Sequence, residues 1–208
     1  MATVSELEGS DIKEAAAVLS QGFKEKMACL KLDVATAAGL MVDSWETGDA
    51  HRYLIAKEEG RIVGVIHLKV KGTETRGASF SVLLKKYGFG AARRFRTGMS
   101  ALREKVPEGD CYIAMISVAE DQRGKGIATE LLRAAKEFVV TKGYRRLTLY
   151  VSKDNEAASK AYLKFGFKIM WETNNVAERI IFGVPHWYFM VMTFRHEDKK
   201  DFFLHGRF

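Results

Sequence analysis

Two short segments carry the side chains best suited to chemistry, and the first combines two glycines with two cations. It reads Arg123-Gly124-Lys125-Gly126 and follows 111–118, an apolar run whose β-branched and aromatic residues indicate a buried strand. After the glycines, apolar residues recur at the spacing of an amphipathic helix, at Ile127, Leu131, Leu132, Ala135, Phe138 and Val139. The sequence therefore predicts a strand, a glycine loop and a helix in that order.

The start of this predicted helix is suited to holding an anion. The first backbone N–H groups of a helix have no partner inside it, and the helix dipole adds partial positive charge there. Because glycine has no Cβ, a ligand can approach those amides, and Arg123 and Lys125 add full positive charges. We therefore expect a phosphate or pyrophosphate to bind at Arg123, Gly124, Lys125, Gly126, Ile127 and Ala128.

The second segment lies on a helix predicted from about residue 155 to 164, after a further strand at 146–151. Asp154 or Asn155 is suited to cap this helix. Asn155, Ser159 and Tyr162 follow one another at i, i+4 and i+7, so they share one helix face. We expect the two strands to be parallel neighbours, and ligands bind in the cleft at the carboxyl ends of such strands.

The two segments together resemble the GCN5-related N-acetyltransferase (GNAT) family. Its acetyl-CoA-binding pattern, Arg/Gln-x-x-Gly-x-Gly/Ala, is matched by Arg123, Gly126 and Ala128. Its later pattern, Asn-x-x-Ala followed by Tyr and then Gly-Phe, is matched by Asn155, Ala158, Tyr162, Gly166 and Phe167. Two patterns in the right order, separated by a strand and a helix, are far more specific than either one alone.

The resemblance implies an α/β fold with a mixed, twisted central sheet flanked by helices. It also implies direct transfer of an acetyl group from acetyl-CoA, as co-substrate, to a primary amine of a small molecule or protein. Tyr162 would be the general acid, since a phenol with a pKa of about 10 can protonate the departing thiolate. The patterns leave both the acceptor and the length of the acyl group open.

The resemblance further implies where the rest of the cofactor binds. The pantetheine arm would pair with the main chain of the central strand, next to a local splay, at Ile116, Ser117 and Val118. The second segment would add contacts at Asn155, Ala158 and Ser159.

The general base stays unassigned. Family members often use a glutamate on or beside the central strand, but 112–116 carries no carboxylate. Glu120 and Asp121 lie at the end of that strand, where solvated or helix-start charges are common. The more distant candidates are His67, Glu172 and His186. An amine whose proton leaves to bulk water needs no strong base.

Three other interpretations stay open or are set aside. A dinucleotide-binding loop also begins Gly124-x-Gly126, but Thr129 replaces its third small residue and Asp154 is too distant to be its acidic partner. An acyl-CoA-binding regulatory module without turnover fits the missing strand carboxylate. A nucleic-acid or ribosome-associated protein could use the basic segment 85–105, although nucleic acid is not the favoured partner.

Composition is ordinary for a soluble globular protein, with 47% hydrophobic and 28% charged residues, and 208 residues suit a single domain. A net charge of +7 allows an acidic partner such as coenzyme A. Cys29 and Cys111 stand apart without metal-ligand spacing, so we expect neither a disulfide framework nor a metal. No apolar run is long enough for a membrane span and no secretory signal is visible, so a cytoplasmic protein without membrane contact is expected.

The remaining elements are predicted from their patterns. We expect a strand at 2–7, a helix at 11–24 capped by Ser10 or Asp11, an irregular helical segment at 28–46, and a hairpin of 53–56 with 62–66. Strands are expected at 167–171 and 186–192, with a loop or hairpin at 174–183. Three aromatic residues could line the acceptor pocket, namely Trp171, Trp187 and Tyr188.

A helical insertion, about 72–109, precedes the central strand. In its central part, 80–105, apolar residues are mixed with basic ones in a pattern that predicts one or two basic amphipathic helices, broken near Gly88 and Gly90. We expect it to cover the sheet, with three sharper roles ranked below that: a cap on the acceptor pocket, a subunit contact, and a surface for acidic partners. The charged and aromatic tail, 196–208, is expected to fray or to dock on a second subunit, and homodimers are common in the family.

Overall fold

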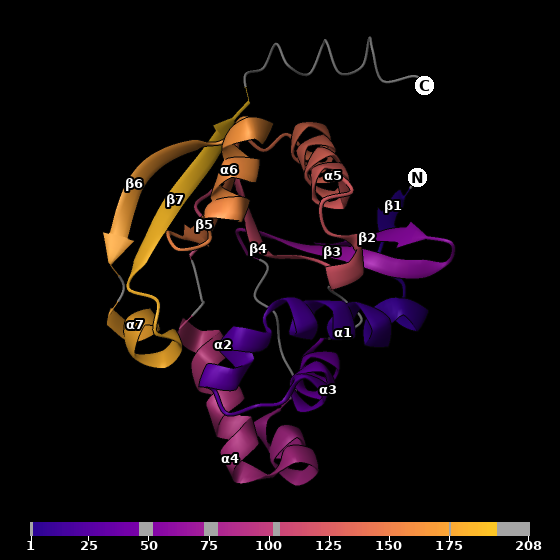
Figure 1. Cartoon of the computed structure of the whole chain (residues 1–208), viewed down its shortest axis with the longest axis vertical. Coiled ribbons are helices and arrows are strands. Elements are labelled where there is room, and N and C mark those ends of the chain that lie inside the picture. The colour runs from indigo at the N-terminus through magenta and orange to yellow at the C-terminus, as the bar shows by residue number, and fades with distance from the viewer. Residues whose placement is uncertain (1, 46–51, 73–78, 102–104, 175, 195–208) are drawn as a thin grey trace.

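A mixed, seven-stranded sheet forms the centre of the protein (Figure 1), in the order β1-β2-β3-β4-β5-β7-β6. The computed structural model describes residues 2–45, 52–72, 79–101, 105–174 and 176–194. The strands are β1 (Thr3–Glu6), β2 (Tyr53–Glu58), β3 (Arg61–Val70), β4 (Asp110–Val118), β5 (Arg146–Ser152), β6 (Lys168–Asn174) and β7 (His186–Thr193). The predicted α/β class with a mixed sheet is confirmed.

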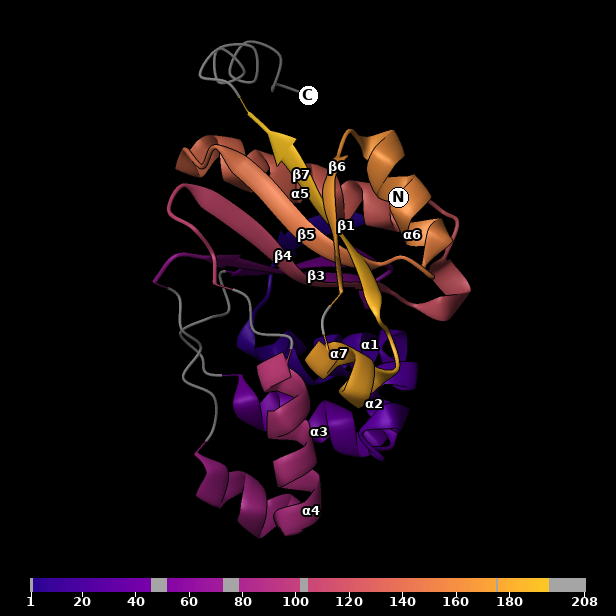
Figure 2. The ribbon, with the colours of Figure 1, turned by 90° about the vertical axis from the view of Figure 1, so that its left-hand side faces the viewer.

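Helices cover both faces of the sheet (Figures 1 and 2). They are α1 (Ile12–Gly22), α2 (Lys24–Cys29), α3 (Val34–Ser44), α4 (Phe80–Ala101), α5 (Ile127–Lys142), α6 (Glu156–Phe165) and α7 (Val176–Phe182). On one face α5 buries Leu131 and Val139 against the sheet. On the other, α1 and α3 bury Leu19 and Leu40 beside Tyr53 of β2. The sheet thus separates two hydrophobic cores.

The two predicted strand connections are confirmed. β2 and β3 form an antiparallel hairpin whose turn residues, Glu59 and Gly60, both have positive φ, of 51° and 79°. Such values belong to the turn that matches the twist of paired strands. β4 and β5 are parallel and are joined through α5, which ends at Gly143 with φ 81°. The α5 connection therefore places the carboxyl ends of β4 and β5 at the same edge of the sheet.

The N-terminal helices differ in detail from the prediction. Asp11 stands at the N-cap of α1, but its carboxylate accepts from Lys57 Nζ at 2.8 Å and makes no capping bond. The described part of segment 28–46 contains the end of α2 and the whole of α3, because the chain turns at Lys31 with φ 53°. Asp33 then caps α3 by accepting from the Thr36 backbone N–H at 2.8 Å.

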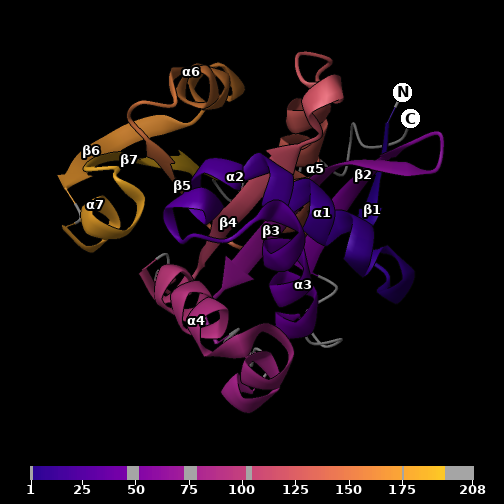
Figure 3. The same cartoon turned by 60° about the horizontal axis from the view of Figure 1, so that its bottom comes forward.

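The helical insertion packs on other helices, so the expectation that it covers the sheet is wrong. Its main contacts are with α3 and α7 (Figure 3). Gly98 brings it close to the loop after α2, since a Cβ there would lie 2.4 Å from Leu30 Cδ1. Tyr87 donates to Asp43 of α3 at 2.6 Å. The predicted break is present at Gly88, where φ is 77° and ψ is 162°.

The connection between β6 and β7 also differs from the expected loop, because it contains α7. β6 and β7 still pair antiparallel. The tail, 196–208, lies outside the described residues. Among the residues that the structure describes, no helix is both long and apolar enough to cross a bilayer, and no group of three or more His, Cys, Asp or Glu could hold a metal ion.

The packing of α5 on the sheet depends on the missing side chain of Gly64 in β3. A Cβ there would lie 2.8 Å from Ile127 Cγ2 and 2.9 Å from Leu131 Cδ1. We predict that Gly64→Ala lowers the free energy of unfolding by about 1–3 kcal/mol, because α5 must move away from the strand. Urea denaturation measures this change.

The matched control is Gly9→Ala, since a Cβ at Gly9 would meet nothing within 4 Å. This control should change stability by less than about 0.5 kcal/mol. Equal stabilities for the two variants would contradict the packing argument.

Candidate functional site

The central strands β4 and β5 part halfway along their length. Their parallel pairing runs from Asp110 with Arg146 to Ile113 with Leu149, and β4 then continues to Val118 without β5 as a partner. A bulge in β4 coincides with this point, because Ile113 and Met115 pair with successive residues of β3. The splay that the family resemblance implied is thus present, and it exposes main-chain groups of β4.

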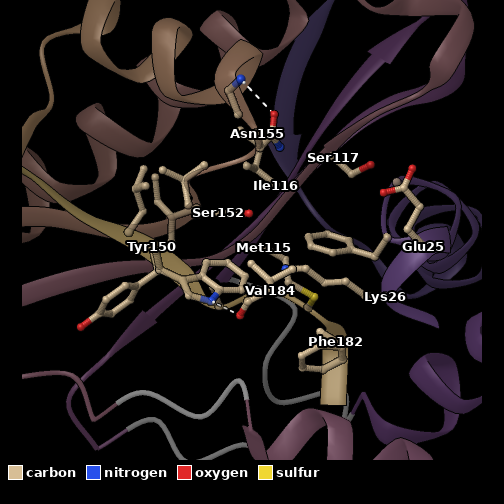
Figure 4. A pocket seen from close by; sticks show the side chains of 18 of the residues that line it. Glu25, Lys26, Met115, Ile116, Ser117, Tyr150, Ser152, Asn155, Phe182 and Val184 are labelled. Atoms are coloured by element: carbon tan, nitrogen blue, oxygen red, sulfur yellow. Dashed lines mark hydrogen bonds between the residues drawn. The ribbon is translucent and has the colours of Figure 1, made fainter. Parts of the chain in front are cut away.

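A cavity of about 730 Å³ fills the space that the splay opens. It lies between the α1–α2 junction, β4, β5, the start of α6 and the segment leading from α7 into β7. Figure 4 shows Asn155 at one end of this cavity and Phe182 at the other, with Met115 and Ile116 between them. Seven of the predicted site residues line it: Ile116, Ser117, Val118, Arg123, Asn155, Ala158 and Tyr162.

The strand wall offers its backbone more than its side chains. Ser117 is 7% exposed and donates its hydroxyl to the Val18 carbonyl oxygen of α1 at 3.0 Å. A Cβ at Gly22 would lie 1.9 Å from Ser117 Oγ, so Gly22 lets α1 approach the strand. The Ser117 side chain therefore fastens α1. Ala119 N–H donates to the Val63 carbonyl of β3, and bonded and non-bonded pairs alternate along an antiparallel ladder, so the main-chain groups of Ile116 and Val118 face the side that β5 has left.

The glycine loop has the predicted backbone form. Gly124 and Gly126 have φ of 77° and 86°, values that favour glycine. Gly126 is the N-cap of α5, and its carbonyl accepts from Thr129 and Glu130 at 2.9 and 3.1 Å. The N–H groups that come earlier in the helix have no intrahelical acceptor by geometry.

The five residues after Arg123 do not line the cavity. Arg123 itself does, so the loop starts at the cavity wall. Lys125 donates to Gln122 Oε1 at 2.9 Å, and Ile127 is buried in the core under α5. A Cβ at Gly124 or Gly126 would meet nothing within 4 Å, so the backbone there is open to an anion. The proposed phosphate contacts at Gly124, Lys125, Gly126, Ile127 and Ala128 stay predictions.

The start of α6 is capped as predicted. Asn155 Oδ1 accepts from the Ala158 backbone N–H at 3.2 Å (Figure 4), and Gly166 ends the helix with φ 114°. Ser159 is 8% exposed and does not line the cavity. Its Oγ has no hydrogen-bond partner among the described residues. The structure thus brings Asn155 and Ala158 to the cavity but leaves Ser159 behind its wall.

Tyr162 is a buried phenol at this site. Its side chain is 8% exposed, lines the cavity, and meets the Phe167 ring edge-on at 5.8 Å between centroids. Burial raises the pKa of Tyr162 to about 12, because the phenolate is costly away from water. The phenol therefore stays protonated at neutral pH, so it can donate a proton but cannot serve as a general base.

None of the suggested bases lines the cavity. Asp121 pairs with Arg61 at 2.8 Å, and Glu172 pairs with Lys153 at 3.0 Å and lies 3.1 Å from His186. His67 is buried under α1 and α3, and desolvation lowers its pKa well below the usual value. Two other carboxylates do line the cavity, those of Glu25 and Asp154.

The α1–α2 junction contributes cavity-lining residues that the sequence patterns did not single out. Phe23, Glu25 and Lys26 line the cavity opposite the strand wall. Of the three aromatic residues expected at the pocket, Trp187 lines it, whereas Trp171 is 51% exposed and stacks on Phe189. Tyr188 does not line it.

Comparison with known proteins agrees with this geometry. A model of the acetyltransferase (GNAT) family matches residues 23–167. A mycothiol acetyltransferase of Corynebacterium aurimucosum is 42% identical over 64 residues, which is 31% of this chain and 20% of that protein. The matched segments of the first curated relatives thus span well under two thirds of those proteins' lengths.

Solved structures share the fold over nearly the whole chain. The ribosomal-protein-S18-alanine N-acetyltransferase of Escherichia coli superposes with a TM-score of 0.55 at 15% identity, covering 93% of this chain and 94% of that one. PaiA N-acetyltransferase of Thermoplasma acidophilum, in complex with coenzyme A, has a TM-score of 0.59 at 14% identity, covering 93% and 99%. Identities this low show the fold alone. The family match, the splayed strands and the glycine loop before α5 lead to one conclusion: the chain belongs to the GNAT acetyltransferase family.

Proposed function

We propose that this protein transfers the acetyl group of acetyl-CoA directly to a primary amine. The observation that carries the proposal is the parting of β4 from β5 beside a glycine loop that opens a helix. Unpaired main-chain groups of β4 can bond to the amides of the pantetheine arm as a neighbouring strand would. The N-terminus of α5 can hold the pyrophosphate, with Arg123 supplying a cation at the cavity wall.

The cavity is suited to a direct transfer. In that reaction the amine nitrogen forms a bond to the acetyl carbon, the carbon–sulfur bond breaks, and the amine gives up a proton. The sulfur leaves as a thiolate and must gain a proton. Three phenols line the cavity, those of Tyr112, Tyr150 and Tyr162. We assign Tyr162 as the donor, because the family resemblance implies that role and burial keeps this phenol protonated. No base is assigned, and the acceptor's proton can leave through water in the open cavity.

Removal of the Tyr162 hydroxyl should slow chemistry without weakening cofactor binding. We predict that Tyr162→Phe lowers kcat by about 100-fold, the lower end of general acid catalysis, and leaves the Kd of acetyl-CoA within about twofold. Single-turnover kinetics and calorimetric titration measure the two quantities.

Tyr188→Phe is the matched control, because Tyr188 is a half-buried phenol of β7 that does not line the cavity. An equal loss of kcat in both variants, or an unchanged single-turnover rate in Tyr162→Phe, would remove Tyr162 from the acid role.

The raised pKa of Tyr162 predicts the alkaline side of the pH–rate profile. As pH rises, more acceptor amine is neutral, so kcat/KM should increase. The proton donor should stay protonated until the pH approaches its pKa of about 12. We therefore expect no descending limb near about pH 10, the ordinary pKa of tyrosine. A descending limb there that disappears in Tyr162→Phe would show that burial does not raise this pKa.

The anion site at the start of α5 can be tested separately. We predict that Gly126→Gln raises the Kd of acetyl-CoA about tenfold or more, because the new side chain fills the space over the first helical amides and strains a left-handed residue. Gly60→Gln carries the same strain in the β2–β3 turn, where a Cβ also meets nothing. If both variants bound acetyl-CoA as tightly as the native protein, the pyrophosphate assignment would fail.

A further inference from the structure

Three aromatic rings surround an ammonium group at the end of the cavity farthest from Asn155. Lys26 Nζ lies 4.4 Å from the ring centroid of Trp187, 5.3 Å from that of Phe23 and 6.0 Å from that of Phe182. All four residues line the cavity, and Figure 4 shows Lys26 beside Phe182 at this end. Together Phe23, Phe182 and Trp187 form what we call the aromatic cage.

The cage is held in place by contacts that do not involve the ammonium. Trp187 is 4% exposed and donates its indole N–H to the Val184 carbonyl oxygen at 3.3 Å. Phe182 is 5% exposed, and its carbonyl oxygen accepts from Cys29 Sγ at 3.7 Å. Two of the three rings are therefore fixed by their own surroundings, while Lys26 is a long, half-buried side chain.

The cage has the chemistry of a site for an organic cation. Aromatic faces attract ammonium groups, and the attraction reaches about 2 kcal/mol when the cation is desolvated. The neighbouring residue Glu25 also lines the cavity. A ligand ammonium can make the same ring contacts that Lys26 Nζ makes.

We propose that the aromatic cage binds a second cationic group of the acceptor, and that Lys26 occupies the cage until such an acceptor displaces it. The inference rests on the proposed transferase function and names its acceptor class, a diamine or polyamine. The remote ammonium sits among Phe23, Phe182 and Trp187, and the reacting amine reaches the part of the cavity lined by Tyr162.

The test compares cadaverine with pentylamine, which has the same chain but one amine. The native protein should have the higher kcat/KM for cadaverine. Trp187→Leu should lower the cadaverine-to-pentylamine ratio of kcat/KM about tenfold, because the ring face nearest the ammonium is lost. Phe182→Leu should also lower this ratio, and it provides the test if Trp187→Leu fails to fold. Trp171→Leu is the control, since Trp171 is exposed outside the cavity.

The Lys26→Met variant distinguishes a lysine that competes with the acceptor from a lysine that only supports the structure. Methionine keeps an unbranched side chain without the charge, so the competing cation is removed. The KM for cadaverine should fall severalfold, and the cadaverine-to-pentylamine ratio should rise. A higher KM for cadaverine in Lys26→Met, or a Trp187→Leu that shifts both amines alike, would overturn the cage as an acceptor site.

Binding measurements separate this proposal from the transferase proposal. Calorimetric titration of the coenzyme A-saturated protein with cadaverine should give a lower Kd for Lys26→Met than for the native chain, whether or not either amine is acetylated. Equal Kd values would overturn the cage. Titration with acetyl-CoA and thiol release with pentylamine report the transferase function independently of the cage.

Discussion

The separation of β4 from β5 after Ile113 and Leu149 is the constraint on which the rest of the site depends. Hydrogen bonds between neighbouring strands normally satisfy every main-chain group inside a sheet. Here the strands part while both are still extended, so β4 reaches Val118 with one side open. Those groups need a partner, and a ligand with amide groups of its own can replace a strand. The end of the pairing thus leaves a cavity between two strands of the same sheet.

The two ends of the cavity differ in the charge that they favour. Near Asn155 and Arg123 the chain leads into the N-terminus of α5, where helix amides and a guanidinium favour an anion. At the other end Phe23, Phe182 and Trp187 surround an ammonium. A polyanionic donor and a cationic acceptor would therefore approach from opposite ends. Tyr162 lines the same cavity and stays a neutral acid because its burial disfavours the phenolate.

Much of the fold followed from local patterns in the chain. Three parts of the fold combine a regular spacing of apolar residues with a turn or cap residue. They are the β2–β3 hairpin with Gly60, the parallel β4–α5–β5 unit with Gly143, and helix α6 with Asn155. Such signals act over a few residues, so they can be recognised without knowing the rest of the fold. The insertion was less predictable. Its amphipathic pattern indicated a buried face, but not that α3 and α7 would cover it.

The sequence by itself determined the glycine loop and the capped helix α6, because these structures depend on neighbours within one or two turns of helix. It also supplied the residue types that can bind a phosphate and protonate a thiolate. Tertiary structure alone decided how far β4 and β5 stay paired and which segments face the opening. It brought Phe23 and Lys26 of the N-terminal region against Phe182 and Trp187 near the other end of the chain. The spacing of apolar residues along the chain does not predict this contact, since it depends on how whole helices pack across the sheet.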